Sequence, residues 1–176
     1  MANRTISLEG VEILSNPDPK KSQFVYRNLS GKPTGKYNST TRFITAKVPA
    51  DRVQEFEEMG IDMWSPSSTG DNGELLYNVR IDISARQPSG DLNCKVYLVG
   101  PNNEPVPMNK DNVGIVDAVN FSVEKVDVLC GVAEKQNNPG HFKLWANVLY
   151  IYQGADKDPY AYKFAHNNDD ELPFEV

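Results

Sequence analysis

The sequence predicts an all-β protein that contains one short helix. Apolar and polar residues alternate along most of the chain, which is the pattern of strands with one buried face. Twelve glycines and twelve prolines among 176 residues indicate many turns. Hydrophobic residues make up 39% of the chain, which is enough for the core of one domain. We therefore expect a small closed barrel with elaborated loops, and a two-sheet sandwich is the alternative.

Seven segments show the alternation of a half-buried strand. In order, they cover residues 6–13, 24–26, 42–48, 75–84, 94–100, 119–132 and 142–152. The first is expected to kink at Gly10. In the last, one face holds Phe142, Leu144, Ala146, Val148 and Tyr150. Residues 28–40 and 65–74 are expected to be mobile loops, and residues 100–105 and 135–141 turns, because they are rich in Gly, Ser, Asn and Pro.

One helix is expected between the third and fourth strands. Asp51 can cap it, and Gln54 stands three residues later in a capping-box arrangement. Its apolar face consists of Val53, Phe56 and Met59. Gly60 can end it, since glycine readily adopts the left-handed conformation that terminates helices.

Charge is segregated along the chain, whose formal net charge is −6. Residues 20–50 contain seven bases and no acid, whereas residues 156–176 contain six acids and two bases. Residues 1–155 therefore carry a net charge of only −2. Such a protein can hold a polyanion on one surface while being acidic as a whole. We expect a folded domain over residues 1–154 and a flexible acidic tail over residues 155–176.

Familiar catalytic and metal-binding motifs are absent from the sequence. It has no Gly-x-Ser-x-Gly, no phosphate loop and no His-Glu-x-x-His, so we expect no enzymatic activity, cofactor or metal. Cys94 and Cys130 are expected to be separate buried thiols, and a disulfide is the alternative. The sequence has no apolar run long enough for a membrane span, and residues 1–10 have no signal-peptide core. We therefore expect a cytoplasmic location and no membrane partner.

Aromatic residues interrupt the basic segment of residues 20–50. Single-stranded nucleic acid requires such a mixture, because its phosphates need cations and its unstacked bases can lie on aromatic rings. Phe24 and Phe43 are expected in the core because they lie in predicted strands. Tyr37, in a basic loop, is the strongest stacking candidate, and Tyr26 suits either role.

Two predicted strands add outward-facing residues to this set. Arg80 lies between Val79 and Ile81, so it should point away from the core and contact phosphate or pair with an acid. Lys143 and Trp145 share the polar face of the last strand, where Trp145 either stacks on a base or is covered by a loop or the tail. Trp64 is expected to make a satellite contact with the core. The candidate nucleic-acid-binding residues are Lys20, Lys21, Tyr26, Arg27, Lys32, Lys36, Tyr37, Arg42, Lys47, Tyr77, Arg80, Lys143 and Trp145.

The end of the chain combines acids with a short apolar hook. Its residues are Asp169, Asp170, Glu171, Leu172, Pro173 and Phe174. The acids should be repelled by nucleic acid, and the hook suits a basic, apolar pocket on a partner or the protein's own basic groove. A solubilising tail would explain the acids alone.

This ending resembles the acidic tip of bacterial single-stranded-DNA-binding proteins, which reads Asp-Asp-Asp-Ile-Pro-Phe. The body is similar to the tailed-phage single-stranded-DNA-binding proteins, and the matching stretches are residues 43–59, 77–85, 95–107, 119–133 and 141–152 in the same order. The resemblance implies an OB-fold barrel in which Arg80 contacts DNA. It also implies a tail that recruits replication, recombination and repair proteins such as a polymerase, a helicase or primase, or a nuclease. Glu175 and Val176 follow Phe174 here, whereas the family tip ends at Phe.

From the residues and the resemblance together, we expect sequence-independent binding and protection of single-stranded DNA during phage DNA replication or recombination, in the host cytoplasm. An RNA-binding OB module and a virion or scaffolding β-protein are the alternatives. A nuclease is a further one, although the clustered acids suit surface solvation better than a metal pair. A homodimer is left open.

Overall fold

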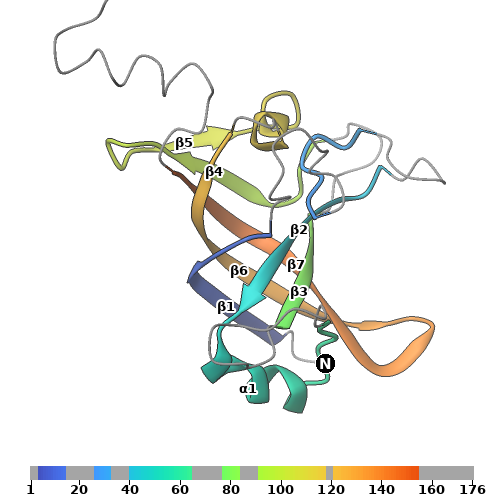
Figure 1. Ribbon diagram of the computed structural model, residues 1–176. Helices are drawn as coiled ribbons and strands as arrows, with labels where there is room; N and C mark the ends of the chain where they lie inside the picture. Colours follow the sequence, from blue (N-terminus) through green and yellow to red (C-terminus); the bar gives the residue numbers. More distant parts are fainter. Residues whose placement is uncertain are drawn as a thin grey trace, which may run out of the picture.

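The computed structural model describes residues 4–14, 26–32, 40–64, 77–83, 91–117 and 121–154. These residues form mostly sheet with one short helix (Figure 1). The strands are β1 (Arg4–Val11), β2 (Arg42–Val48), β3 (Tyr77–Ile83), β4 (Lys95–Val99), β5 (Pro105–Met108), β6 (Val123–Lys135) and β7 (Asn138–Gln153). The helix is α1 (Val53–Glu58), and the 3-10 turns are η1 (Ala50–Arg52) and η2 (Val113–Asp117).

The main sheet follows the strand order β1-β6-β7-β3-β2. Neighbours on this path are antiparallel except β7 and β3, which are parallel. The two ends of the path meet, because the Leu14 amide donates to the Thr45 carbonyl and the Lys47 amide to the Glu12 carbonyl, both at 2.8 Å. The result is a partly closed five-stranded barrel of the OB type, as predicted.

The remaining elements lie at the two ends of this barrel. β4 pairs in parallel with the second half of β7, and β5 pairs with β4. Figure 1 shows the β4–β5 hairpin and η2 at one end and α1 at the other. The core between them is apolar, and Leu8, Ile44, Ile81, Leu144 and Leu149 are fully buried. Each such side chain contributes about 1.5–3 kcal/mol to folding.

The expected kink in β1 is confirmed. Gly10 has a φ of +64°, and the pairing register with β6 shifts between Leu8 and Val11. This bend lets residues 12–14 leave β6 and run along β2, which brings the ends of the barrel together.

The predicted capping box is wrong. The chain enters the helix through η1, so Asp51 lies inside that turn and Arg52 occupies the N-cap without a side-chain cap bond. The end of the helix is confirmed, since Gly60 has a φ of +75°. Phe56 is the buried residue of α1, and Val53 and Met59 pack against the core as expected.

A second correction concerns the last strand. Leu129 of β6 pairs with Val148 of β7, and Cys130 pairs with Ala146. Asn147, between these two residues of β7, is therefore an extra residue without a partner position on β6. A bulge of one residue reverses the faces of everything beyond it. Leu144 and Ala146 are therefore buried before the bulge, and Leu149 and Ile151 after it. Val148 and Tyr150 lie on the outer face, where strict alternation had placed them inside.

Several smaller predictions have mixed outcomes. Residues 24 and 25 lie outside the described ranges, and Tyr26 is in a turn rather than a strand. β5 was missed because its two prolines disfavour a strand, but they are tolerated at a sheet edge. The turn between the last two strands is confirmed, although both strands extend to within two residues of each other. The loop residues 33–39 and 65–74 are not described.

The two cysteines are free and buried, as expected. Burial raises the pKa of Cys94 to about 11 and that of Cys130 to about 12. Within the described ranges, no helix has the length and apolar character that a membrane span needs. In the same part of the chain, no three His, Cys, Asp or Glu side chains are grouped as metal ligands.

Candidate nucleic-acid interface

A cavity of about 400 Å³ opens beside the start of β7 and combines cations with aromatic rings. Its lining residues are Asp62, Met63, Trp64, Arg80, Asp82, Lys135, Phe142 and Lys143. They come from the segment after α1 and from β3, β6 and β7. We call this set of residues the Arg80 cavity.

Strand alternation places the charged residues of the cavity. Val79 and Ile81 are buried in the barrel, so Arg80 and Asp82 point outward from β3. Lys143 is likewise exposed beside buried Leu144 on β7. Because β3 and β7 are parallel neighbours there, Lys143 reaches Asp82, with 3.8 Å between Nζ and Oδ2.

Arg80 is exposed as predicted, and it makes two contacts at once. Its Nε donates to Oδ1 of Asp82 at 2.9 Å, and its guanidinium lies 4.1 Å from the centre of the Phe43 ring. The side chain nevertheless stays 49% exposed. Of the two roles expected from the sequence, pairing with an acid is thus seen in the free protein. The bond to Asp82 uses Nε, so it does not involve the Nη groups that would meet a phosphate.

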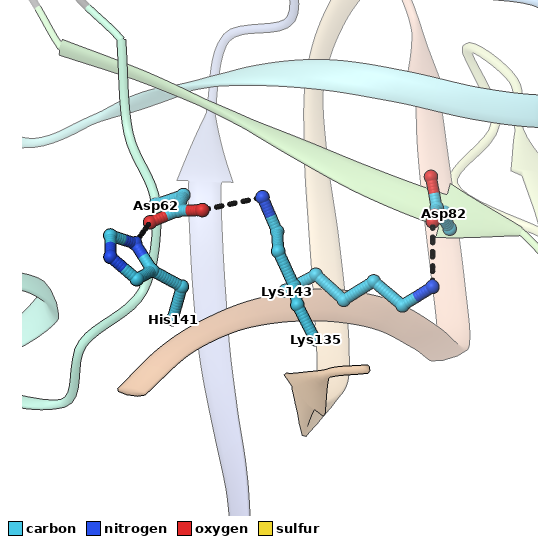
Figure 2. Close-up of polar contacts among 5 residues, drawn as sticks. All are labelled: Asp62, Asp82, Lys135, His141 and Lys143. Carbon is cyan, nitrogen blue, oxygen red and sulfur yellow. Dashed lines mark hydrogen bonds and ion pairs between the residues drawn. The ribbon is translucent and has the colours of Figure 1, made fainter. Parts of the chain in front are cut away.

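Asp62 is the second acid of the cavity, and it holds two basic side chains (Figure 2). Lys135 donates a hydrogen bond to Oδ2, and Nδ1 of His141 lies 2.7 Å from Oδ1. The bond from Lys135, and to a lesser extent that with His141, lowers the pKa of Asp62. Asp62 therefore stays ionised and joins the turn end of the β6–β7 hairpin to the segment that follows α1.

Backbone pairing fixes that segment in place. The Asp62 amide donates to the Phe142 carbonyl at 3.0 Å, and the Phe142 amide donates to the Gly60 carbonyl at 2.9 Å. Two residues later, Trp64 exchanges two backbone hydrogen bonds with Asn78, at 2.8 and 2.9 Å. Residues 61–64 thus lie between the starts of β3 and β7, and residues 62–64 form one wall of the cavity.

The sequence assigned Trp64 and Phe43 incorrectly. Trp64 is 42% exposed at the cavity rather than in a satellite of the core, because its backbone pairing holds it at the surface. Phe43 is only partly buried, since it lies on the outer face of β2 under Arg80. Alternation with buried Ile44 would have revealed the position of Phe43. Nothing in the local pattern indicated that of Trp64.

The basic segment does not join this cavity. Arg27 is 2% exposed and faces Asp117, and burial lowers its pKa, so we remove it from the candidate interface. Arg42 donates to the Leu29 carbonyl, and Lys47 pairs with Glu12 at 2.7 Å. Neither residue lines the Arg80 cavity. The expected single basic channel is therefore not seen among the described members of the segment.

Other candidates lie elsewhere or outside the described ranges. Lys32 is exposed and Tyr26 is half-buried in a turn. Tyr77 lines a different cavity, of about 590 Å³, together with Lys47. The candidates that the structure does not describe are Lys20, Lys21, Lys36, Tyr37 and the tail residues Asp169, Asp170, Glu171, Leu172, Pro173 and Phe174.

Trp145 is half-buried and lies apart from the Arg80 cavity. Its ring covers Gly131, where an added Cβ would lie 2.2 Å from the indole, and its Nε1 donates to Asn147 at 3.0 Å. It lines a cavity of about 680 Å³ with Arg4 and Phe142. Three glutamates line the same cavity, so it is a poor place for phosphate. Among the described residues, Trp145 packs against β6, and the suggested cover by the tail lies outside them and stays a prediction.

Comparison with known proteins is sparse. No protein-family model and no curated protein matches the sequence. Among solved structures, the chain is similar to gp2.5, a single-stranded DNA binding protein encoded by bacteriophage T7. That likeness has a TM-score of 0.39 and 10% sequence identity, and it covers 92% of this chain and 95% of that chain.

Proposed function

We propose that this chain binds single-stranded DNA without sequence preference through the Arg80 cavity. One observation carries the proposal: Arg80, Lys135 and Lys143 line the same concave surface as an exposed Trp64. Cations suit the phosphates, and an exposed indole suits the face of an unpaired base. Contacts of this kind do not depend on base identity, so they support binding without sequence preference.

The acids of the cavity set how tightly the DNA is held. Asp82 and Asp62 occupy the three cations in the free protein, so phosphates must compete with these carboxylates. All the pairs are at least partly solvent-exposed, and such pairs contribute only about 0–1 kcal/mol each. A strand with several phosphates can therefore displace them. Before DNA binds, these ion pairs also hold the side chains of Arg80, Lys135 and Lys143 in position.

Duplex recognition fits this surface less well. Reading a groove takes a helix or a two-stranded ribbon that can enter it. The helix α1 spans six residues, and Glu55, Glu57 and Glu58 on it are exposed. A phosphate backbone would be repelled by this face. The proposal therefore assigns the cavity to strands whose bases are free to stack.

We extend the proposal to the end of the chain and to a role in phage DNA replication or recombination. The charge segregation and the family resemblance of the sequence support this extension. Residues 167–176 would compete with DNA for cationic surface and, once displaced, present Leu172 and Phe174 to partner enzymes.

Fluorescence titration tests the binding itself. The wild-type chain should bind oligo(dT) with an affinity that falls as salt rises, because phosphate contacts release counterions. A duplex of the same length should bind more weakly, and an RNA oligomer of matched sequence tests discrimination by the 2′-hydroxyl. Absence of any salt-dependent binding to oligo(dT) would overturn the proposal.

A further inference from the structure

The outer face of the other half of β7 carries a cluster of tyrosines. Tyr150 and Tyr152 point outward there, because Leu149 and Ile151 are buried. Tyr97 on β4 is the pairing partner of Tyr150, and the two rings stack with centroids 4.9 Å apart and planes 20° apart. We call Tyr97, Tyr150 and Tyr152 the tyrosine face.

The bulge at Asn147 creates this face. Before the bulge, β7 is flanked by β3, and after it by β4. Without the extra residue, Tyr150 would share the buried face of Leu144. With it, the outer surface of one strand carries Lys143 at the Arg80 cavity and the tyrosines farther along. The two surfaces are therefore joined by a single β-strand.

The charges around the tyrosine face favour an anionic ligand. The ammonium of Lys125 lies 5.0 Å from the centre of the Tyr152 ring, and Lys95 is exposed two residues before Tyr97. The acid among these side chains, Asp127, already accepts from the Tyr152 hydroxyl at 2.9 Å and from the Gly10 amide at 2.6 Å. These two donors fix the position of the carboxylate, which keeps its negative charge, and the two lysines outnumber it.

We propose that the tyrosine face is a second stacking platform for the DNA strand held at the Arg80 cavity. This inference rests on the proposed function and adds a path to it. The DNA strand follows β7 from Lys143 to Tyr152, ten residues whose nine steps span roughly 30 Å. It runs on the side of β7 that β3 and β4 flank, whereas Trp145 and its neighbouring glutamates lie toward β6 and α1. Bases stack against the tyrosine rings, and Lys95 and Lys125 meet the phosphates. OB-fold proteins bind about 4–16 nucleotides per barrel, and a path of this length is compatible with such a site size.

Dependence on oligonucleotide length gives the test. Wild-type protein should gain affinity strongly between dT oligomers of about four and about twelve nucleotides, because only the longer one reaches both surfaces. A variant with Tyr97→Leu and Tyr150→Leu should lose most of that gain, about tenfold, without a change in the salt slope. The matched variant with Tyr97→Phe and Tyr150→Phe keeps the rings and should bind as wild type. Thermal unfolding of each variant checks that it is folded.

A second measurement is independent of the tyrosine substitutions. Lys125→Ala should lower the slope of log affinity against log salt by about 0.7 for the longer oligomer. Unchanged affinity of the folded leucine variant for the longer oligomer would overturn the platform and leave the Arg80 cavity standing. Loss of self-association with unchanged DNA affinity would instead show an interface between copies. Failure of the wild type to bind either oligomer would overturn the proposed function itself.

Discussion

The carboxylate of Asp82 accepts a hydrogen bond from Nε of Arg80 at 2.9 Å, on the face of β3 that points away from the core. Lys143 approaches the other oxygen of the same carboxylate at 3.8 Å. One acid therefore competes with phosphate for two of the three cations of the proposed interface.

Replacing this acid should strengthen DNA binding. Asp82→Asn keeps the shape of the side chain but removes the charge, so Arg80 and Lys143 become free to meet phosphates. Because exposed pairs contribute about 0–1 kcal/mol, the gain should reach at most roughly fivefold at low salt. Fluorescence titration with oligo(dT) measures it. Asp91→Asn is the control, since Asp91 also lies 3.8 Å from a lysine but outside the cavity, and it should change nothing. Weaker binding by Asp82→Asn would contradict the competing role of the acid.

The titration of Asp62 should reveal which partner holds it. Its folded pKa is lowered, so its contribution to stability is present above the unfolded value of about 3.9 and is lost as the pH falls through the folded pKa. Lys135 is the larger cause. Lys135→Ala should therefore raise the pKa of Asp62 more than His141→Ala does. NMR titration of the side-chain carboxyl carbon gives both values, and the reverse order would refute this assignment.

Removing Asp117 should destabilise the fold. It is buried, its carboxylate accepts from the amides of Leu29 and Ser30 at 2.9 and 2.8 Å, and it attracts the buried Arg27. Asp117→Ala leaves that charge without this compensation, so the free energy of unfolding should fall by about 3 kcal/mol. Asp111→Ala, at an exposed position, is the control. Urea unfolding compares the two, and equal stabilities would show that Asp117 is dispensable.

Deleting residues 167–176 should tighten binding to single-stranded DNA, chiefly at low salt. The deleted segment carries four acids, and competition between its charges and DNA is screened as salt rises. Titration of the full-length and shortened chains at two salt concentrations measures the difference. Identical affinities at low salt would exclude competition by the tail.

Much of the barrel could be predicted because its strands are regular. Alternation located β2 to the residue, and Gly10 marked the kink in β1. Arg80 was correctly placed outside because its neighbours in sequence are apolar and buried. These are local properties that one strand reveals on its own.

The remaining features depend on contacts between distant segments. The bulge at Asn147 arises from pairing with β6, so the outward position of Tyr150 was hidden from the pattern of β7 alone. Arg27 was assigned to the interface by its charge, whereas burial beside Asp117, 90 residues later, removes it from the surface. Backbone hydrogen bonds to Asn78 on β3 hold Trp64 at the cavity. Charge and ring counts therefore pointed to the basic segment, whereas the cavity that combines cations with aromatic rings is lined by other residues.

The proposed interface depends on Arg80, and a comparison of the substitutions Arg80→Ala and Lys47→Ala tests this dependence most directly. Arg80 and Lys47 are 49% and 47% exposed, and each pairs with an acid, but only Arg80 lines the cavity with Trp64. The measurement is the slope of log affinity for oligo(dT) against log salt. Arg80→Ala should weaken binding and lower the slope by about 0.7, while Lys47→Ala leaves both unchanged. Equal effects of the two substitutions, or no effect of Arg80→Ala, would contradict the account.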